Sequence, residues 1–209
     1  MAYSLNALLE KTFGSIRKLT FYTLNTQPVV RKKAKFITNP QTEKQQANRN
    51  NVTFLIYAFR ALRPLLIISL NSRPKSRSAY NEFMSRNLNQ SIIDGQFFPE
   101  EFQISTGDIP STDFMAIRLV DESNKFLINW DEALNGNQNN EDILCAAIYT
   151  VTNKRFHYSI TDVTREQQNA QIAFNLNFHT VSCYLYLFFV RSDYSMSSEI
   201  SVHNFDAIN

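Results

Sequence analysis

The 209-residue chain is 44% hydrophobic and 13% aromatic, which is enough to build a core and too apolar for a disordered chain. It holds only 4 glycines, which argues against the glycine-rich loops that bind nucleotide phosphates. Residues 1–90 carry 15 Lys and Arg against 3 Asp and Glu, whereas residues 91–209 carry 6 against 16. A net charge of +12 beside one of −10 predicts a basic half that binds a partner, or head-to-tail contact between two copies.

The cellular compartment is predicted from the N-terminus and the cysteines. The first residues lack the basic start and the long apolar run of a signal peptide. No run approaches about 18 apolar residues without charge, and Leu62–Leu70 is short and contains Arg63 and Pro64, so we expect no membrane span. Cys145 and Cys183 lie in apolar, strand-like runs, which favours two buried thiols over a disulfide. We therefore expect a cytoplasmic protein, or one within a particle that is assembled in the cytoplasm.

The first predicted element is a basic β-hairpin. Its strands are Ile16–Leu24 and Val29–Phe36, with a polar turn between them. Side chains alternate between the two faces of a strand, so Arg31, Lys33 and Lys35 are expected on the same face. Three positive charges would then share one surface of the hairpin.

A long helix is predicted after the hairpin. Asn39 is a suitable N-cap and Pro40 a suitable first residue, and the helical pattern continues to Arg63. Pro64 has no backbone N–H to donate, so it is predicted to kink or end the helix. The apolar residues with helical spacing, which predict the buried face, are Val52, Leu55, Ile56, Phe59, Leu62 and Leu66.

Basic side chains accompany this helix and the segment that follows it. Arg49, Arg60 and Arg63 fall along one edge of the apolar face. A basic, proline-broken loop then leads to Ser78, which is predicted to cap a second helix, Ala79–Asn89.

From about Asp113 the apolar period changes from helical to alternating. The strand Val181–Arg191 is apolar on both faces, so it is expected at the centre of a sheet. Trp130 lies late in the second strand, where fibronectin-type-III-like sandwiches bury a tryptophan. Seven strands with polar turns are typical of an antiparallel sandwich, and they are Phe114–Val120, Lys125–Asp131, Ile143–Val151, Arg155–Thr161, Gln171–Phe178, Val181–Arg191 and Ser197–Phe205.

The predicted fold is α+β: an N-terminal β-hairpin plus helices, followed by an antiparallel fibronectin-III/immunoglobulin-like β-sandwich. Residues 1–95 form a basic hairpin-and-helix module in this prediction, residues 96–112 a connector, and residues 113–209 the acidic sandwich domain.

Six short motifs give the chain a family resemblance. They are Lys18-Leu-Thr-Phe-Tyr22, Gln27-Pro-Val-Val-Arg31, Asn39-Pro-Gln-Thr42, Gln46-Ala-Asn-Arg49, Leu62-Arg-Pro-Leu65 and Ala79-Tyr-Asn81. Over roughly residues 14–205 the chain resembles an uncharacterised family of Bacteroidota proteins, in which a basic hairpin, an Asn-Pro-x-Thr helix start and a Tyr-Asn helix precede a β-rich C-terminal region. It departs from the family in the hairpin turn, where Thr26 and Gln27 replace glycine. The resemblance implies the same architecture, and the family has no assigned activity to carry over.

The basic side chains of the first half are the predicted binding site for an anionic partner. They are Arg31, Lys32, Lys33, Lys35, Arg49, Arg73, Lys75 and Arg77. Phosphate contacts need Lys and Arg on a shared surface with little acid to neutralise them. The acidic half of a neighbouring copy would fit the same surface, so DNA or RNA and a protein partner are favoured equally.

Catalytic and metal-binding motifs are not evident in the sequence. There is no Gly-x-Ser-x-Gly, and His157, His179 and His203 show no metal-ligand spacing. The acids of the loop Asp131–Asp142 offer oxygen ligands for calcium, but they lack the alternation of an EF-hand, and solvated turn acids are the favoured interpretation. We therefore expect neither an enzyme nor a cofactor.

Together these patterns favour a non-enzymatic structural or assembly protein, as in a phage-like or nucleic-acid-containing particle. The basic half would contact an anionic partner, and the sandwich would contact copies of itself or another protein. The alternative is a host nucleic-acid-binding protein that acts as a monomer or dimer. Assembly predicts a large apolar patch on the helix face around Phe54 and Tyr57, or on the sandwich, whereas nucleic-acid binding predicts that the basic side chains converge on one exposed surface.

Overall fold

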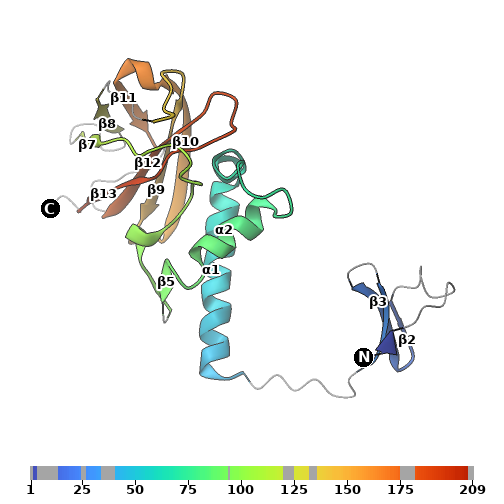
Figure 1. Ribbon diagram of the computed structural model, residues 1–209. Coiled ribbons are helices and arrows are strands. Elements are labelled where there is room, and N and C mark those ends of the chain that lie inside the picture. Colours follow the sequence, from blue (N-terminus) through green and yellow to red (C-terminus); the bar gives the residue numbers. More distant parts are fainter. Residues whose placement is uncertain are drawn as a thin grey trace. The chain divides into compact units, whose positions relative to one another are not determined.

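The computed structural model describes residues 2–3, 14–24, 27–33, 41–93, 95–119, 125–131, 136–174 and 182–206. It divides the chain into two compact units, Met1–Thr42 and Glu43–Asn209 (Figure 1). The structure thus places the boundary differently from the predicted division into 1–95, 96–112 and 113–209. The helices belong to the same unit as the sandwich because they share a hydrophobic core with it.

The N-terminal unit is an antiparallel sheet with the strand order β1-β4-β3-β2. Its strands are β1 (Ala2–Tyr3), β2 (Gly14–Ile16), β3 (Leu19–Leu24) and β4 (Gln27–Lys32). The predicted hairpin is present as β3 and β4, which pair Tyr22 with Val29. The predicted first strand is interrupted, because Arg17 adopts a φ of 51° and turns the chain between β2 and β3. Ile16 therefore belongs to a separate strand. The predicted strand end at Phe36 lies outside the described residues.

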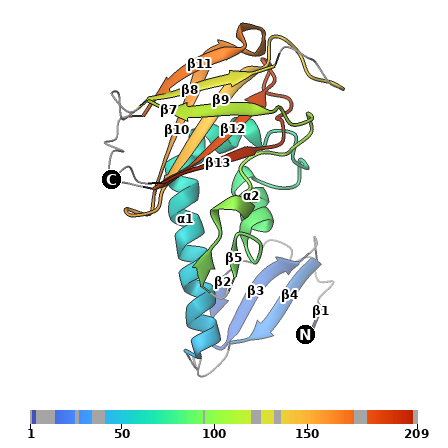
Figure 2. The same ribbon diagram turned by 90° about the vertical axis from the view of Figure 1, so that its left-hand side faces the viewer.

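The second unit contains an antiparallel sandwich of two sheets (Figure 2). One sheet has the order β11-β8-β7 and the other the order β10-β9-β12-β13. The strands are β7 (Phe114–Arg118), β8 (Lys125–Trp130), β9 (Ile143–Thr150), β10 (Arg155–Thr164), β11 (Asn169–Ala173), β12 (Cys183–Val190) and β13 (Ser201–Phe205). Each corresponds to a predicted strand, although several ends differ by a few residues. The predicted α+β fold with a fibronectin-III/immunoglobulin-like sandwich is confirmed.

A core of apolar side chains lies between the two sheets. Phe126, Ile128 and Trp130 of β8 belong to it together with Leu185 and Phe189 of β12. Trp130 is buried, as predicted, and its Nε1 donates a 2.7 Å hydrogen bond to the carbonyl oxygen of Arg165. The tryptophan therefore packs in the core and satisfies its one polar group.

A second core lies on the outer face of the four-stranded sheet, which is covered by helix α1 (Glu43–Ser69) (Figure 2). Tyr186 and Phe188 of β12 pack there with Leu55 and Leu62 of α1. Because neighbouring side chains of a strand point to opposite faces, β12 is buried on both sides, as predicted. The sheet face would expose these aromatic rings without α1, which explains why the helix belongs to the sandwich unit.

Helix α1 continues through Pro64 to Ser69, so of the two predicted outcomes, a kink or an end at proline, the end is wrong. A proline inside a helix costs about 3 kcal/mol or more. Leu65 and Leu66, which follow it, are fully buried, and burying a leucine side chain contributes about 1.5–3 kcal/mol. The packing of these leucines therefore offsets the lost hydrogen bond. The predicted start at Asn39 and Pro40 lies outside the described residues.

By length and composition, α1 also qualifies as a candidate membrane-spanning helix, and about 33% of its most apolar window is buried within the protein. The predicted lack of a membrane span rested on the absence of a run of about 18 apolar residues without charge, and it stays a prediction.

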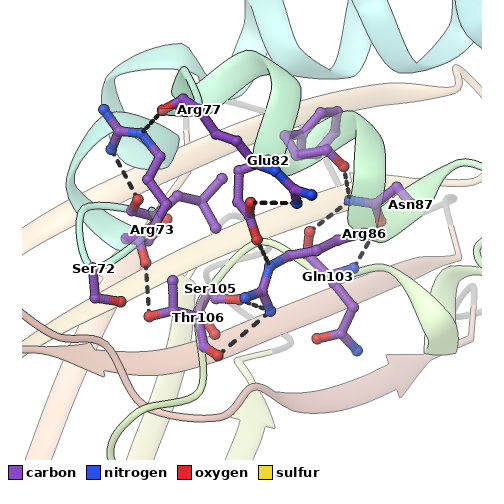
Figure 3. A network of polar contacts seen from close by, with 12 residues as sticks. Ser72, Arg73, Arg77, Glu82, Arg86, Asn87, Gln103, Ser105 and Thr106 are labelled. Atoms are coloured by element: carbon purple, nitrogen blue, oxygen red, sulfur yellow. Dashed lines mark hydrogen bonds and ion pairs between the residues drawn. The ribbon is translucent and has the colours of Figure 1, made fainter. Parts of the chain in front are cut away.

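Helix α2 (Ala79–Asn87) begins as predicted, since Ser78 Oγ accepts a 3.1 Å hydrogen bond from the backbone N–H of Asn81. Residues 96–112, the predicted connector, pack against this helix. Asn87 exchanges two hydrogen bonds with the backbone of Gln103, at 2.8 and 2.9 Å (Figure 3). The connecting elements are β5 (Ile92–Ile93), β6 (Gln96–Phe97) and the 3-10 helix η2 (Pro99–Glu101).

Candidate anion-binding surface

The predicted cations fall in both compact units. Arg31, Lys32 and Lys33 are exposed in the N-terminal unit, and Lys35 lies outside the described residues. The second unit contains Arg49, Arg73, Lys75 and Arg77, of which only Arg73 is half-buried.

In the N-terminal unit the cations gather where β4 ends beside the β2–β3 turn. The backbone N–H of Lys33 donates a 2.7 Å hydrogen bond to the carbonyl oxygen of Lys18, which brings these two lysines together. The guanidinium of Arg31 lies over the ring of Tyr22, 5.7 Å from its centre. The described residues of this unit include no Asp or Glu. Its positive charge is therefore not neutralised within that part of the unit.

Arg73 and Arg77 have structural hydrogen bonds. Arg73 donates to the carbonyl oxygens of Leu70 and Arg77, at 2.8 and 3.0 Å. Arg77 Nη1 lies 3.2 Å from Glu82 Oε2, and Arg86 Nε lies 2.8 Å from Glu82 Oε1 (Figure 3).

These contacts also change the acidity of Glu82. Burial alone would raise its pKa, but the hydrogen bonds and charges of Arg86 and Arg77 outweigh burial and hold the pKa below the ordinary value. Glu82 is thus ionised and neutralises Arg77. We therefore regard Arg73 and Arg77 mainly as structural residues.

Arg60 and Arg63 of α1 have no such partners. Both are exposed, and neither forms a hydrogen bond or an ion pair with another described residue. They are three residues apart, so they lie on the same side of the helix. Sequence reasoning placed them along one edge of the helix but did not include them in the site. Their lack of a salt-bridge partner depends on the tertiary structure.

The two arginines line a groove of about 740 Å³ between α1 and the start of α2, which we call the arginine groove. Its aromatic side chains are Phe59 and Tyr80, whose rings meet edge to face with 5.2 Å between their centres. Ile56, Ile67 and Arg73 also line it. The groove therefore combines positive charge with an apolar lining.

The sequence around the arginine groove is free of acid. From Lys44 to Asn81 the chain contains 7 Lys and Arg and no Asp or Glu. The next acid, Glu82, is buried and paired. This stretch of the chain therefore carries an excess of positive charge.

A second groove lies on the other flank of α1, with a volume of about 490 Å³. Phe54 and Tyr57 line it together with Lys154 of the β9–β10 turn and Arg155 at the start of β10. The side chain of Tyr57 is 64% exposed, whereas Phe54 packs against the ring of Phe97 with 4.7 Å between ring centres. Of the two aromatic residues predicted to form an apolar patch, Tyr57 is the accessible one.

The two cysteines are buried free thiols, as predicted. Burial raises the pKa of both, that of Cys145 to about 12. Cys183 Sγ accepts a 2.7 Å hydrogen bond from Arg118 Nη2. At neutral pH these thiols are protonated, so neither presents a reactive thiolate.

The histidines and loop acids are also placed by the structure. Burial lowers the pKa of His157, where Arg155 adds to the effect, and of His203. His179 lies outside the described residues.

Residues 132–135 of the acidic loop also lie outside the described residues. At the end of this loop, Asp142 is fully buried, and its carboxylate lies 3.5 Å from Arg165 Nε and 2.9 Å from Arg191 Nε. In the described part of the chain, therefore, this acid stabilises the sandwich instead of facing solvent.

The protein is therefore a fibronectin-type-III-like sandwich with a helix packed on the outer face of one sheet, and this helix has basic side chains on its exposed surface. The chain belongs to a family of unknown function, DUF6266, whose model matches residues 22–202. Membership confirms the predicted resemblance to an uncharacterised family. No curated protein sequence matches the chain.

Similar solved structures include two human fibronectin type III domains. The fn3 domain of the collagen alpha-1(XX) chain has 10% sequence identity and a TM-score of 0.34, covering 50% of this chain and 86% of that domain chain. The fn3 domain of contactin 1 has 8% sequence identity and a TM-score of 0.30, and the match covers 47% of this chain and 76% of that chain.

Proposed function

We propose that the protein is a non-enzymatic assembly protein, whose arginine groove binds an acidic protein surface. In the simplest case that surface is the sandwich of a second copy. The supporting observation is the pair of exposed guanidiniums, Arg60 and Arg63, without a partner among the described residues. A guanidinium binds a carboxylate through two parallel hydrogen bonds, which gives such a contact defined geometry.

The composition of the chain supports an acidic protein as the partner. The sandwich half carries exposed carboxylates, among them Asp131, Glu141, Asp162 and Glu166. The arginine groove and the flank around Tyr57 add apolar and aromatic contacts, which are enriched with arginine at protein interfaces. Charge and apolar contact are thus available on the same helical surface.

Sedimentation or light scattering across a salt series tests the proposal. The native protein should associate at low salt and dissociate as salt screens the charges. The double variant Arg60→Glu/Arg63→Glu should be monomeric at every salt concentration. The matched control, Arg60→Lys/Arg63→Lys, keeps the charge but loses the two parallel hydrogen bonds of a guanidinium, so it should still associate at low salt, more weakly than the native protein. The same mass for native protein and reversed variant at low salt would overturn the proposal.

A second candidate function is nucleic-acid binding by the N-terminal unit. It is favoured by Arg31 over Tyr22, because a cation beside an aromatic ring on a sheet suits a phosphate and a stacked base. We expect a random single-stranded oligonucleotide to bind with a steep salt dependence if this candidate is right. Lys32→Glu/Lys33→Glu should then abolish binding, while Arg60→Glu/Arg63→Glu should leave most of it.

A further inference from the structure

A third groove, of about 550 Å³, lies between the first two turns of α1 and the region around β5. Three asparagines line it: Asn48 and Asn51 from α1, and Asn89 after α2. The other lining residues are Glu43, Lys44, Ala47, Ile92 and Ile93. We call it the carboxamide groove. It lies entirely within the second compact unit.

The most informative residue of this groove is Asn51. Its side chain is only 6% exposed, yet it makes no hydrogen bond with another described residue. The small exposed part of this side chain includes its carboxamide, which opens to the groove. Asparagine is also a poor helix former, so the helix itself does not favour it at this position. A largely buried amide that has no described protein partner and opens to a groove indicates a ligand that completes its hydrogen bonds.

The chemistry of the groove differs from that of the arginine groove. Among the described lining residues, Glu43 and Lys44 carry opposite charges, so these residues have no net charge. None of the described lining residues is aromatic, so they offer no ring on which a nucleobase would stack. Ile92 is buried and Ile93 half-exposed, and they form an apolar wall. An uncharged ligand with amide groups and one apolar side chain fits this lining.

A peptide backbone has the matching hydrogen-bonding groups. A carboxamide presents a donor and an acceptor side by side, which complement the C=O and N–H of a peptide group. Lys44 to Asn51 spans about 10 Å of helix at 1.5 Å per residue. An extended chain rises about 3.3 Å per residue, so about three residues occupy that length.

We propose that the carboxamide groove binds a short, extended and uncharged peptide segment of a partner protein. The carboxamides of Asn48, Asn51 and Asn89 hydrogen-bond to its backbone, and the wall of Ile92 and Ile93 accepts one apolar side chain. The inference does not depend on the arginine groove, whose partner is acidic.

The test is a calorimetric titration of the full chain. The probe is a pool of acetylated and amidated tetrapeptides of uncharged residues. Asn51→Leu replaces the amide with an apolar group of the same branched shape, and the matched control, Asn50→Leu, changes the exposed neighbour of Asn51. We expect native protein and Asn50→Leu to bind the pool, and Asn51→Leu to lose affinity about tenfold or more. Binding of the pool to Asn51→Leu as tightly as to native protein, or no binding to native protein, overturns the proposal.

A second measurement separates binding from a structural role. Because no described residue hydrogen-bonds to the Asn51 side chain and leucine is the better helix former, the melting temperature of Asn51→Leu should be equal to or above that of the native protein. A lower melting temperature would show that Asn51 stabilises the fold and would overturn the inference. Binding of a neutral nucleoside or monosaccharide in place of the peptide pool would overturn the ligand class.

Discussion

Arginines have opposite surroundings in two regions of the second unit. In the sandwich, Arg165 and Arg191 pair with the fully buried Asp142. On α1, Arg60 and Arg63 are exposed and have no partner among the described residues. A buried charge is stable only when it is paired, because removing it from water is costly, whereas an exposed charge stays hydrated. The sandwich arginines therefore stabilise the fold, while those of α1 are available to a partner.

Asp142→Asn should have the largest effect on stability. It leaves two arginines, one of them fully buried, without their carboxylate, which should lower the free energy of unfolding by about 3–5 kcal/mol. Urea denaturation followed by the fluorescence of Trp130 measures the change. Glu141→Gln removes the exposed neighbouring carboxylate and should stay within about 0.5 kcal/mol of the native protein. Equal unfolding midpoints for the two variants would contradict the role given to Asp142.

Glu82→Gln should have an intermediate effect, because Glu82 is paired with two arginines that are partly exposed. We expect a loss of about 1–2 kcal/mol at neutral pH. The folded-state pKa of Glu82 lies below its ordinary value of 4.5, so its contribution is present above that pH and is lost as pH falls through the folded-state pKa. The unfolding free energies of variant and native protein should therefore converge in acid. A gap that stays constant over a denaturation series from neutral pH to below 4.5 would refute the ion-pair explanation.

Arg60→Ala/Arg63→Ala should have the smallest effect on stability, within about 0.5 kcal/mol, because no described residue loses an ion pair. The same double change should remove salt-dependent association in sedimentation.

Arg165→Ala is the contrasting variant, because it removes a buried guanidinium that stacks on Phe189, 3.9 Å from the centre of the ring. This variant should unfold at a clearly lower urea concentration than the native protein. Similar stabilities for these variants would remove the distinction between the two regions.

Local patterns in the sequence were sufficient to predict most elements. The seven strands follow from the alternation of apolar and polar side chains, and the start of α2 follows from Ser78, whose partner is three residues away. Burial of Trp130 and of the two thiols also follows from apolar strand patterns. In each case the information lies within one element and its adjacent turn.

The candidate sites were predicted less well, because they depend on contacts between distant elements. Arg73 and Arg77 look like free cations in the sequence, but they bond to Leu70 and Glu82 in the folded chain. Arg60 and Arg63 were seen only as one edge of a helix. Asn51 appeared as one more polar residue in a polar stretch, and the fold buries it.

Residue types and their spacing were sufficient to predict the strand order along the chain, the two apolar faces of β12, and the separation of a basic half from an acidic one. Those properties depend on residue type and period, which each segment carries on its own. The tertiary structure decided that α1 continues through Pro64, that the helices belong with the sandwich, and which charges are paired. Ser197 Oγ, for example, donates a 2.7 Å hydrogen bond to the carbonyl oxygen of Ser69 at the end of α1. Contacts between residues so far apart in sequence form only when the chain packs, so no local pattern contains them.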